Sequence, residues 1–78
     1  MTWEIKDEKL VNDYVFEDFK GALEFTNQVG KVAEEMGHHP DMLIHSYNKV
    51  TIRTSTHLEN TITDKDYELA KKIDDLGI

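Results

Sequence analysis

The sequence predicts an α+β fold, in which a four-stranded antiparallel sheet carries two helices on one face, in the order β-β-α-β-β-α. Two segments near the N-terminus alternate between apolar and polar residues, which is typical of strands. Two later segments repeat apolar residues every three or four positions, which is typical of amphipathic helices. Between them lie two alternating runs joined by a turn signal, and this pattern predicts a β-hairpin.

The first two strands are predicted in residues 3–6 and 9–16. Trp3 and Ile5 alternate with charged and polar neighbours, and the same alternation continues over the longer second run. Asn12 and Asp13 interrupt that second run. The run is interpreted as a strand, in which this polar pair could form a bulge or a turn.

Residues 18–36 are predicted to form the first helix. Asp18 can accept hydrogen bonds from the free N–H groups of the first turn. Gly37 stands where a left-handed residue would end the helix, and Pro40 prevents its resumption. The apolar stripe of this helix consists of Phe19, Ala22, Leu23, Val29, Val32, Ala33 and Met36.

Residues 42–56 are predicted to form the hairpin, with Asn48-Lys49 as its two-residue turn, because Asn tolerates positive φ. One set of alternating side chains faces one way and the other set faces the opposite way. The first set is Val50, Ile52 and Thr54, and the second is Thr51, Arg53 and Ser55.

The second helix is predicted to begin at Thr63, after a loop over residues 58–63. Residues 63–66 approximate a capping box in which Asp66 replaces the usual glutamate. The apolar stripe of this helix is Tyr67, Ala70, Ile73 and Leu76, with Leu69 beside it.

Composition restricts the class of function. A chain of 78 residues is expected to form a single domain, residues 1–78, with a small core that self-association would supplement. Nine Lys and Arg against sixteen Asp and Glu, a net charge of −7, disfavour binding to nucleic acid or to an anionic membrane. The absence of cysteine excludes disulfides. No apolar run is long enough for a membrane span, and the charged N-terminus does not resemble a signal peptide, so a cytoplasmic protein is expected.

Three of the four histidines are expected to meet at one end of the sheet. His38 and His39 precede the third strand, and His57 follows the fourth. If the hairpin centres on its predicted turn, position 40 lies opposite position 57. Glu34 on the last turn of the first helix and Asp66 at the start of the second can reach the same rim. Because imidazole titrates near neutral pH, such a group of side chains can give and take protons.

Each of these residues also has a purely structural interpretation. The adjacent histidines could be ordinary loop residues, Glu34 a solvent-facing helix residue and Asp66 only a helix cap. A zinc site is a further alternative, because three histidines and a carboxylate can bind zinc. Adjacent residues of an extended loop point apart, however, so the His38-His39 pair is poorly placed to share one ion. His45, in the middle of a strand, is interpreted as a residue without chemistry.

The sequence resembles the pterin-4a-carbinolamine dehydratases, also called 4a-hydroxytetrahydrobiopterin dehydratases. The likeness extends from about Phe16 to Asp74, and the sequence departs from the family at the N-terminus, where the family's leading helix is shortened or absent. The residues that carry the resemblance are Glu34, His38-His39-Pro40, Tyr47, His57 and Asp66.

The resemblance implies loss of water from a 4a-hydroxytetrahydropterin to give a quinonoid dihydropterin, by histidine acid–base catalysis and with neither cofactor nor metal. It implies that His38 and His57 transfer protons while His39 chiefly holds the pterin, although these roles could be exchanged. It also implies that Asp66 orients His57 and that Glu34 orients a histidine or binds a ring N–H. The remaining residues expected at the substrate are Pro40, Ser55 and Thr56, the last two through backbone hydrogen bonds.

The resemblance further implies a homodimer or homotetramer, and coupling to an aromatic amino-acid hydroxylase that supplies the substrate. Two alternatives to catalysis are a protein-binding or dimerisation module and a pterin-binding protein of molybdenum-cofactor metabolism. The side chain of the physiological pterin is left open by the sequence.

Overall fold

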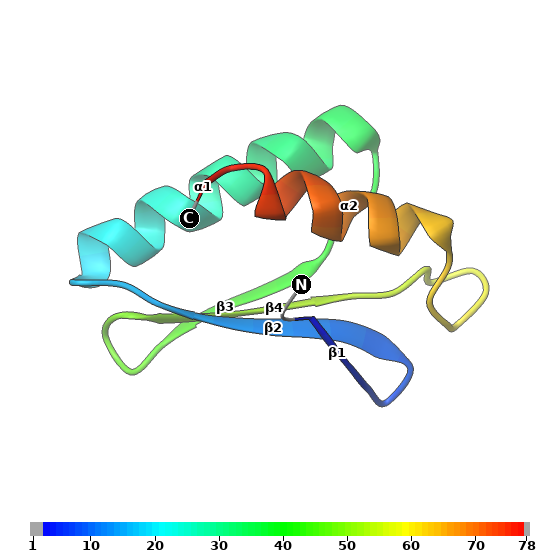
Figure 1. The fold of residues 1–78 in the computed structure, drawn as a ribbon, viewed down its shortest axis with the longest axis horizontal. Coiled ribbons are helices and arrows are strands. Elements are labelled where there is room, and N and C mark those ends of the chain that lie inside the picture. The colour runs from blue at the N-terminus through cyan, green and yellow to red at the C-terminus, as the bar shows by residue number, and fades with distance from the viewer. Residues whose placement is uncertain (1–2, 78) are drawn as a thin grey trace.

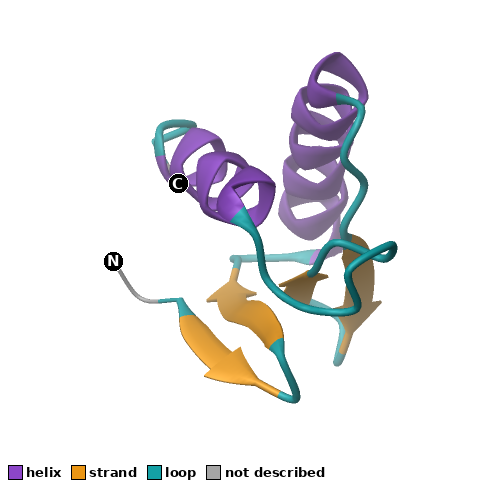
Figure 2. Cartoon of the chain, turned by 90° about the vertical axis from the view of Figure 1, so that its right-hand side faces the viewer, coloured by secondary structure: helices purple, strands orange, loops and turns teal. Residues whose placement is uncertain are grey.

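The computed structural model describes residues 3–77, and they adopt the predicted architecture (Figure 1). The elements are β1 (Glu4–Lys6), β2 (Lys9–Val15), α1 (Phe19–Met36), β3 (Asp41–His45), β4 (Lys49–Thr54) and α2 (Asp64–Asp74). The strands form one antiparallel sheet in the order β1-β2-β4-β3. Both helices lie on the same face of this sheet (Figures 1 and 2). The predicted fold class and element order are therefore confirmed.

Strand β2 is continuous through its polar pair. Asn12 pairs with Ile52 and Asp13 with Thr51 in a regular antiparallel register, so neither a bulge nor a turn interrupts the strand. The buried Asn12 side chain donates a hydrogen bond to the Tyr14 hydroxyl at 2.9 Å. This partner allows a polar residue to point toward the helices without leaving its amide unsatisfied.

Helix α1 begins and ends as predicted. The Asp18 carboxylate accepts a hydrogen bond from the Gly21 N–H at 2.8 Å, which caps the first turn. At the other end Gly37 has a φ of 66°, the left-handed conformation that glycine adopts without steric cost. The chain therefore leaves the helix sharply, directly before the two histidines.

The core lies between the helices and the sheet. The apolar stripe predicted for each helix was partly wrong, because some of its residues are exposed. Phe19 and Leu23 are 48% and 43% exposed, whereas Phe25 is buried. In α2, Tyr67 is exposed and Leu69 is buried. The errors lie near the start of each helix, because other members of the predicted stripes are buried, namely Ala22, Val29, Ala33, Ala70 and Ile73. The buried core cluster is Ala22, Phe25, Val29, Val50, Ile52, Leu69 and Ile73.

The turn of the β3–β4 hairpin lies at residues 46–48, not at Asn48-Lys49 as predicted, because His45 pairs with Lys49. The first two turn residues have φ values of 54° and 73°. Asn48 instead joins the hairpin to the end of β2, where it exchanges hydrogen bonds of 2.8 Å with the backbone of Phe16. This long-range contact accounts for the difference in turn position.

Neither helix in the described part of the chain combines the length and the hydrophobicity needed to cross a membrane.

Candidate acid–base site

The end of α1 places the two histidines beside the helix terminus. The Gly37 N–H bonds to the Glu34 carbonyl at 3.2 Å, and the His38 N–H bonds to the Ala33 carbonyl at 3.1 Å. These bonds satisfy carbonyls that the helix end would otherwise leave free. Pro40 cannot continue a helix, so the chain turns into β3.

The end of β4 places His57 at the same end of the molecule. The hairpin register differs from the expected one, since Asp41 pairs with Arg53 and position 40 does not lie opposite position 57. The Thr56 N–H donates to the Thr61 carbonyl at 2.8 Å, and its own carbonyl accepts from the Asn60 N–H at 2.8 Å. Residues 57–60 therefore form a tight turn that holds His57 just beyond the sheet.

Asp66 is the buried centre of the hydrogen bonding in this region. It lies in the first turn of α2 with 0% of its surface exposed. One carboxylate oxygen accepts from the Thr54 hydroxyl at 2.6 Å, and the other accepts from the Thr56 hydroxyl and the Thr63 N–H, both at 2.9 Å. These contacts tie the start of α2 to the end of β4. Asp66 is thus both a helix-capping residue and part of the site.

The ionised form of Asp66 is favoured in spite of its burial. Burial alone would raise the pKa of this carboxyl group. The hydrogen bonds from Thr54, His38, the Thr63 backbone and Thr56 outweigh burial and lower the pKa below its usual value. Asp66 therefore carries a negative charge at neutral pH and acts only as a hydrogen-bond acceptor.

His38 is oriented by this carboxylate. Its Nε2 lies 2.6 Å from an Asp66 oxygen, and only 11% of its side chain is exposed. Because an ionised carboxylate only accepts, the shared proton must belong to Nε2. Nδ1, which makes no hydrogen bond with the described residues, remains available for proton exchange.

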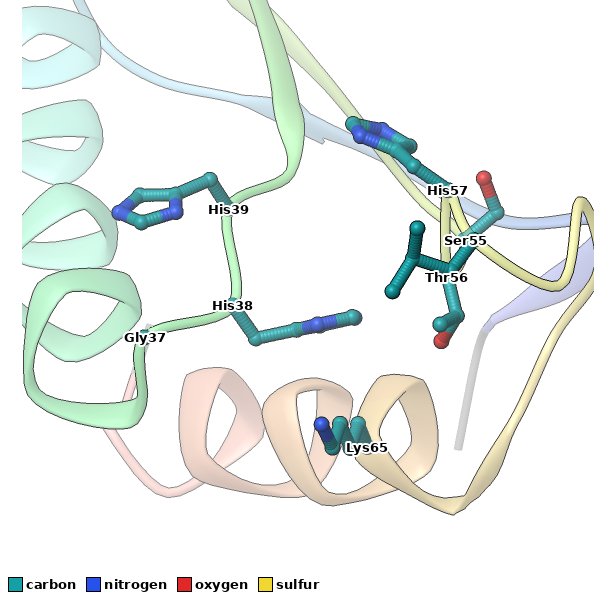
Figure 3. Close-up of a pocket in the computed structure, with 8 residues that line it drawn as sticks. Gly37, His38, His39, Ser55, Thr56, His57 and Lys65 are labelled. Carbon is teal, nitrogen blue, oxygen red and sulfur yellow. The ribbon is translucent and has the colours of Figure 1, made fainter.

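His39 has a carboxylate partner as well, but on the outside of the molecule. Its Nε2 contacts Glu34, and the two side chains are 59% and 77% exposed. Figure 3 shows its ring turned toward α1, whereas the ring of His38 extends toward Ser55 and Thr56. The expectation that adjacent histidines point apart agrees with this arrangement.

A cavity of about 300 Å³ lies between the loop after α1 and the end of β4, with α2 beside it (Figure 3). This volume is at the lower end of the range for small-molecule sites. The lining residues are Gly37, His38, His39, Ser55, Thr56, His57, Leu58 and Lys65.

The expected site residues fall into three groups. The three histidines, Ser55 and Thr56 line the cavity together. Glu34 and Asp66 do not line it but contact His39 and His38, respectively. Pro40 does not line the cavity, and Tyr47, which carried part of the family resemblance, is 65% exposed in the hairpin turn.

The structure differs from expectation at two of these positions. Among the described residues, Asp66 contacts His38 and not His57, because its side chain points inward from α2 while His57 lies beyond the end of β4. The backbone N–H and carbonyl of Thr56 are already engaged within the chain, and its hydroxyl is bound to Asp66. Of the two residues expected to offer backbone groups, this leaves Ser55.

Sequence reasoning missed several residues that build the site. Thr54 and Thr63 hold the carboxylate of Asp66, and Leu58 and Lys65 line the cavity. The sequence could have indicated Lys65, because it directly precedes the candidate site residue Asp66 at the predicted start of the second helix. Thr54 was predicted only to face the same way as two core residues. Its partner lies twelve positions away.

A metal centre finds no support in the geometry. Within residues 3–77, no three His, Cys, Asp or Glu side chains are arranged to hold a metal ion together. The two histidine–carboxylate contacts explain why these side chains do not converge on one point, because Nε2 of His38 and Nε2 of His39 each face a separate carboxylate.

Comparison with known proteins identifies relatives over nearly the whole chain. Residues 1–76 match the family described as pterin 4 alpha carbinolamine dehydratase. A protein from Sulfurisphaera tokodaii is 47% identical over 95% of this chain and 78% of its own length, and one from Thermomicrobium roseum is 43% identical over 96% and 80%. Both are named, provisionally, pterin-4-alpha-carbinolamine dehydratase.

Solved structures show the same fold. A Brucella melitensis protein titled transcriptional coactivator/pterin dehydratase has a TM-score of 0.84 and 33% identity, covering 94% of this chain and 79% of that one. A pterin dehydratase-like protein, titled a RuBisCO assembly factor of the alpha-carboxysome, has a TM-score of 0.73 over 95% and 84% of the two chains. At 19% identity, the second likeness concerns the fold alone.

Proposed function

Because this chain belongs to the pterin 4 alpha carbinolamine dehydratase family, we propose that it removes water from 4a-hydroxytetrahydrobiopterin, the pterin-4a-carbinolamine, to give quinonoid dihydropterin. This reaction would regenerate a pterin cofactor after an aromatic amino-acid hydroxylase has used it. The observation that carries the proposal is the cavity lined by three histidines, one of which is held by a buried carboxylate.

The proposed reaction needs one acid and one base. The C4a–O bond breaks while the acid protonates the departing hydroxyl, which leaves as water. The lone pair of the neighbouring ring nitrogen forms a C=N bond to C4a, and the base removes the proton of that nitrogen. One proton is donated and one is received, so the protein needs no other reactant. Positioned acid–base groups typically accelerate such steps about 10²–10⁴-fold.

We assign the base to His38 and the acid to His57. With Nε2–H donated to Asp66, His38 can receive the ring proton at Nδ1, and the carboxylate then stabilises the imidazolium that forms. His57 is exposed at the mouth of the cavity, where the released water can reach solvent. The protons return to their starting positions through that water.

The remaining residues are proposed to hold the pterin. His39 lines the cavity, and Glu34 orients it from outside. The backbone of Ser55 can bond to the edge of the flat heterocycle, because this residue follows Thr54, the last paired position of β4. Pro40 contributes only by directing the chain away from the site.

Self-association is proposed as part of the working state. Strand β3 lies at the edge of the sheet, and Met42 and Leu43 on it are 41% and 52% exposed. Phe19 and Leu23 add exposed apolar surface on α1. An uncovered apolar edge strand is a ready site for pairing with another chain, so a homodimer or homotetramer is expected.

The proposal is tested by replacing His57 with alanine and measuring dehydration of enzymatically generated 4a-hydroxytetrahydropterin. His57→Ala should slow turnover about 10²-fold, whereas the melting temperature should hardly change because the side chain is exposed. His45→Ala is the matched control. It removes an imidazole from strand β3, where His45 bonds to Thr51 and does not line the cavity.

Equal turnover of His57→Ala and the wild-type protein would contradict the acid–base proposal. A non-catalytic binding module would then be the better interpretation. Sedimentation of each variant shows whether the oligomer is preserved, so that a change in assembly is not mistaken for a change in catalysis.

A further inference from the structure

The cavity differs in charge from the rest of the molecule. The chain carries sixteen Asp and Glu against nine Lys and Arg, yet none of the eight lining residues is acidic. The lining contains three histidines and Lys65, whose side chain carries an ammonium group. Asp66 lies behind the cavity, and its charge is shared among four hydrogen bonds. The cavity therefore presents positive and neutral groups within an acidic protein.

Lys65 has no structural role that would explain a cation at this position. It lies in the first turn of α2, between two acidic residues. The N-terminus of a helix favours negative side chains, so a lysine there is unfavourable for the helix. Lys65 forms no ion pair with any residue that the structure describes. A residue that breaks a local rule without compensation is a candidate for function.

We infer that Lys65 selects a reduced pterin whose side chain ends in an anionic group, either a carboxylate or a phosphate. This inference rests on the proposed function, because it concerns the substrate of the same cavity. With the heterocycle held between the histidines and Ser55, the Lys65 ammonium can pair with a negative charge on the side chain of the pterin (Figure 3).

Exposed acidic residues near the cavity limit the size of the effect. Asp64 and Glu59 are exposed neighbours of the lining residues, although neither lines the cavity itself, and Glu34 is occupied by His39. Since Lys65 is exposed, water and salt screen its attraction for an anion. We expect at most about fivefold tighter binding of an anionic ligand at low ionic strength, the upper end of the range for an exposed ion pair.

The test compares three stable 7,8-dihydropterins that share the ring system. One carries a neutral dihydroxypropyl side chain, the second carries the same chain as a phosphate ester, and the third carries a benzoylglutamate. Dissociation constants are measured by calorimetry for the wild-type protein, Lys65→Gln, Lys65→Arg and Lys72→Gln. Lys72→Gln is the matched control, because Lys72 is an exposed lysine of the same helix that does not line the cavity.

The inference predicts that the wild-type protein prefers at least one anionic ligand, that Lys65→Gln loses the preference, and that Lys65→Arg and Lys72→Gln retain it. The preference should shrink as salt is added. Tighter binding of only the phosphate or only the benzoylglutamate identifies the anion. Equal affinities for all three ligands, or a preference that survives in Lys65→Gln, would overturn the inference.

The same experiment separates this inference from the proposed function. If all three ligands bind the wild-type protein equally, the cavity still binds pterins and only the role of Lys65 is lost. If none of them binds, the pterin site itself is contradicted, and the inference falls with it.

Discussion

The two adjacent histidines contact carboxylates through the same ring atom, but in opposite surroundings. Nε2 of His38 faces Asp66, and these side chains are 11% and 0% exposed. Nε2 of His39 faces Glu34, and these side chains are 59% and 77% exposed. One pair lies between the helices and the sheet, and the other lies on the surface beside α1.

The difference lies in what holds each carboxylate. Asp66 accepts three further hydrogen bonds, from Thr54 at the end of β4, from Thr56 just beyond it and from Thr63 before α2, so its position is fixed by the fold. The Glu34 carboxylate makes no further hydrogen bond with the described residues. His38 is therefore held in one orientation before substrate binds, whereas His39 can turn to suit a ligand. Preorganisation of this kind suits a proton-transferring group.

The strongest test of the comparison is the stability of Asp66→Ala against Glu34→Ala. Removing Asp66 leaves two threonine hydroxyls and the Thr63 N–H without their acceptor in a buried place. We expect a loss of about 3–5 kcal/mol in the free energy of unfolding for Asp66→Ala and less than about 0.5 kcal/mol for Glu34→Ala. Urea unfolding at pH 7 measures both. Similar losses would show that the buried network does not hold the fold together.

The same stability measurement at acid pH tests the charge of Asp66, because the pKa of this residue is lower in the folded protein than its usual value. A carboxyl of this kind stabilises the fold above its unfolded pKa, about 3.9, and the contribution is lost as pH falls through the folded value. Asp66→Asn cannot ionise, and its amide nitrogen cannot accept. The stability difference between the wild-type protein and Asp66→Asn should therefore be largest near neutral pH and shrink below about pH 4.

The second test compares His38→Ala with His39→Ala in turnover. If the fixed histidine transfers the proton, His38→Ala should lower kcat roughly 10²-fold, while His39→Ala should mainly raise KM. Steady-state kinetics with 4a-hydroxytetrahydropterin separate the two parameters. Equal losses of kcat would mean that burial does not distinguish the roles of the two histidines.

The sequence was sufficient to predict those parts of the fold that depend on local chemistry. Asp18 caps α1, Gly37 ends it and Thr63 precedes α2, as expected from the preferences of these residue types. The hairpin turn was predicted wrongly because Asn48 is used by Phe16, a partner 32 positions away. Local propensity cannot report such a contact.

Long-range contacts also limit what the sequence predicts about the site. The three histidines were expected together, and they line one cavity, because the ends of α1 and β4 suffice to bring them near each other. Which carboxylate faces which histidine depends on the direction of side chains across 28 positions, and Asp66 contacts His38 instead of the expected His57. Likewise, the sequence contains two apolar rows on α1, and only the packing against the sheet decides that Phe25 is buried and Leu23 exposed.

The smallest expected effect belongs to the exposed pair. Glu34→Gln keeps the size of the side chain but removes the charge beside His39, and we expect KM to rise less than about threefold, since exposed ion pairs are weak. Glu35→Gln is the matched control, because it makes the same charge change on the same turn of α1, and Glu35 forms no ion pair with the described residues. The difference between these variants should disappear as salt screens the pair. If Glu34→Gln lowered kcat as much as His38→Ala, the surface pair would take part in the chemistry, and burial would not be what divides the two histidines.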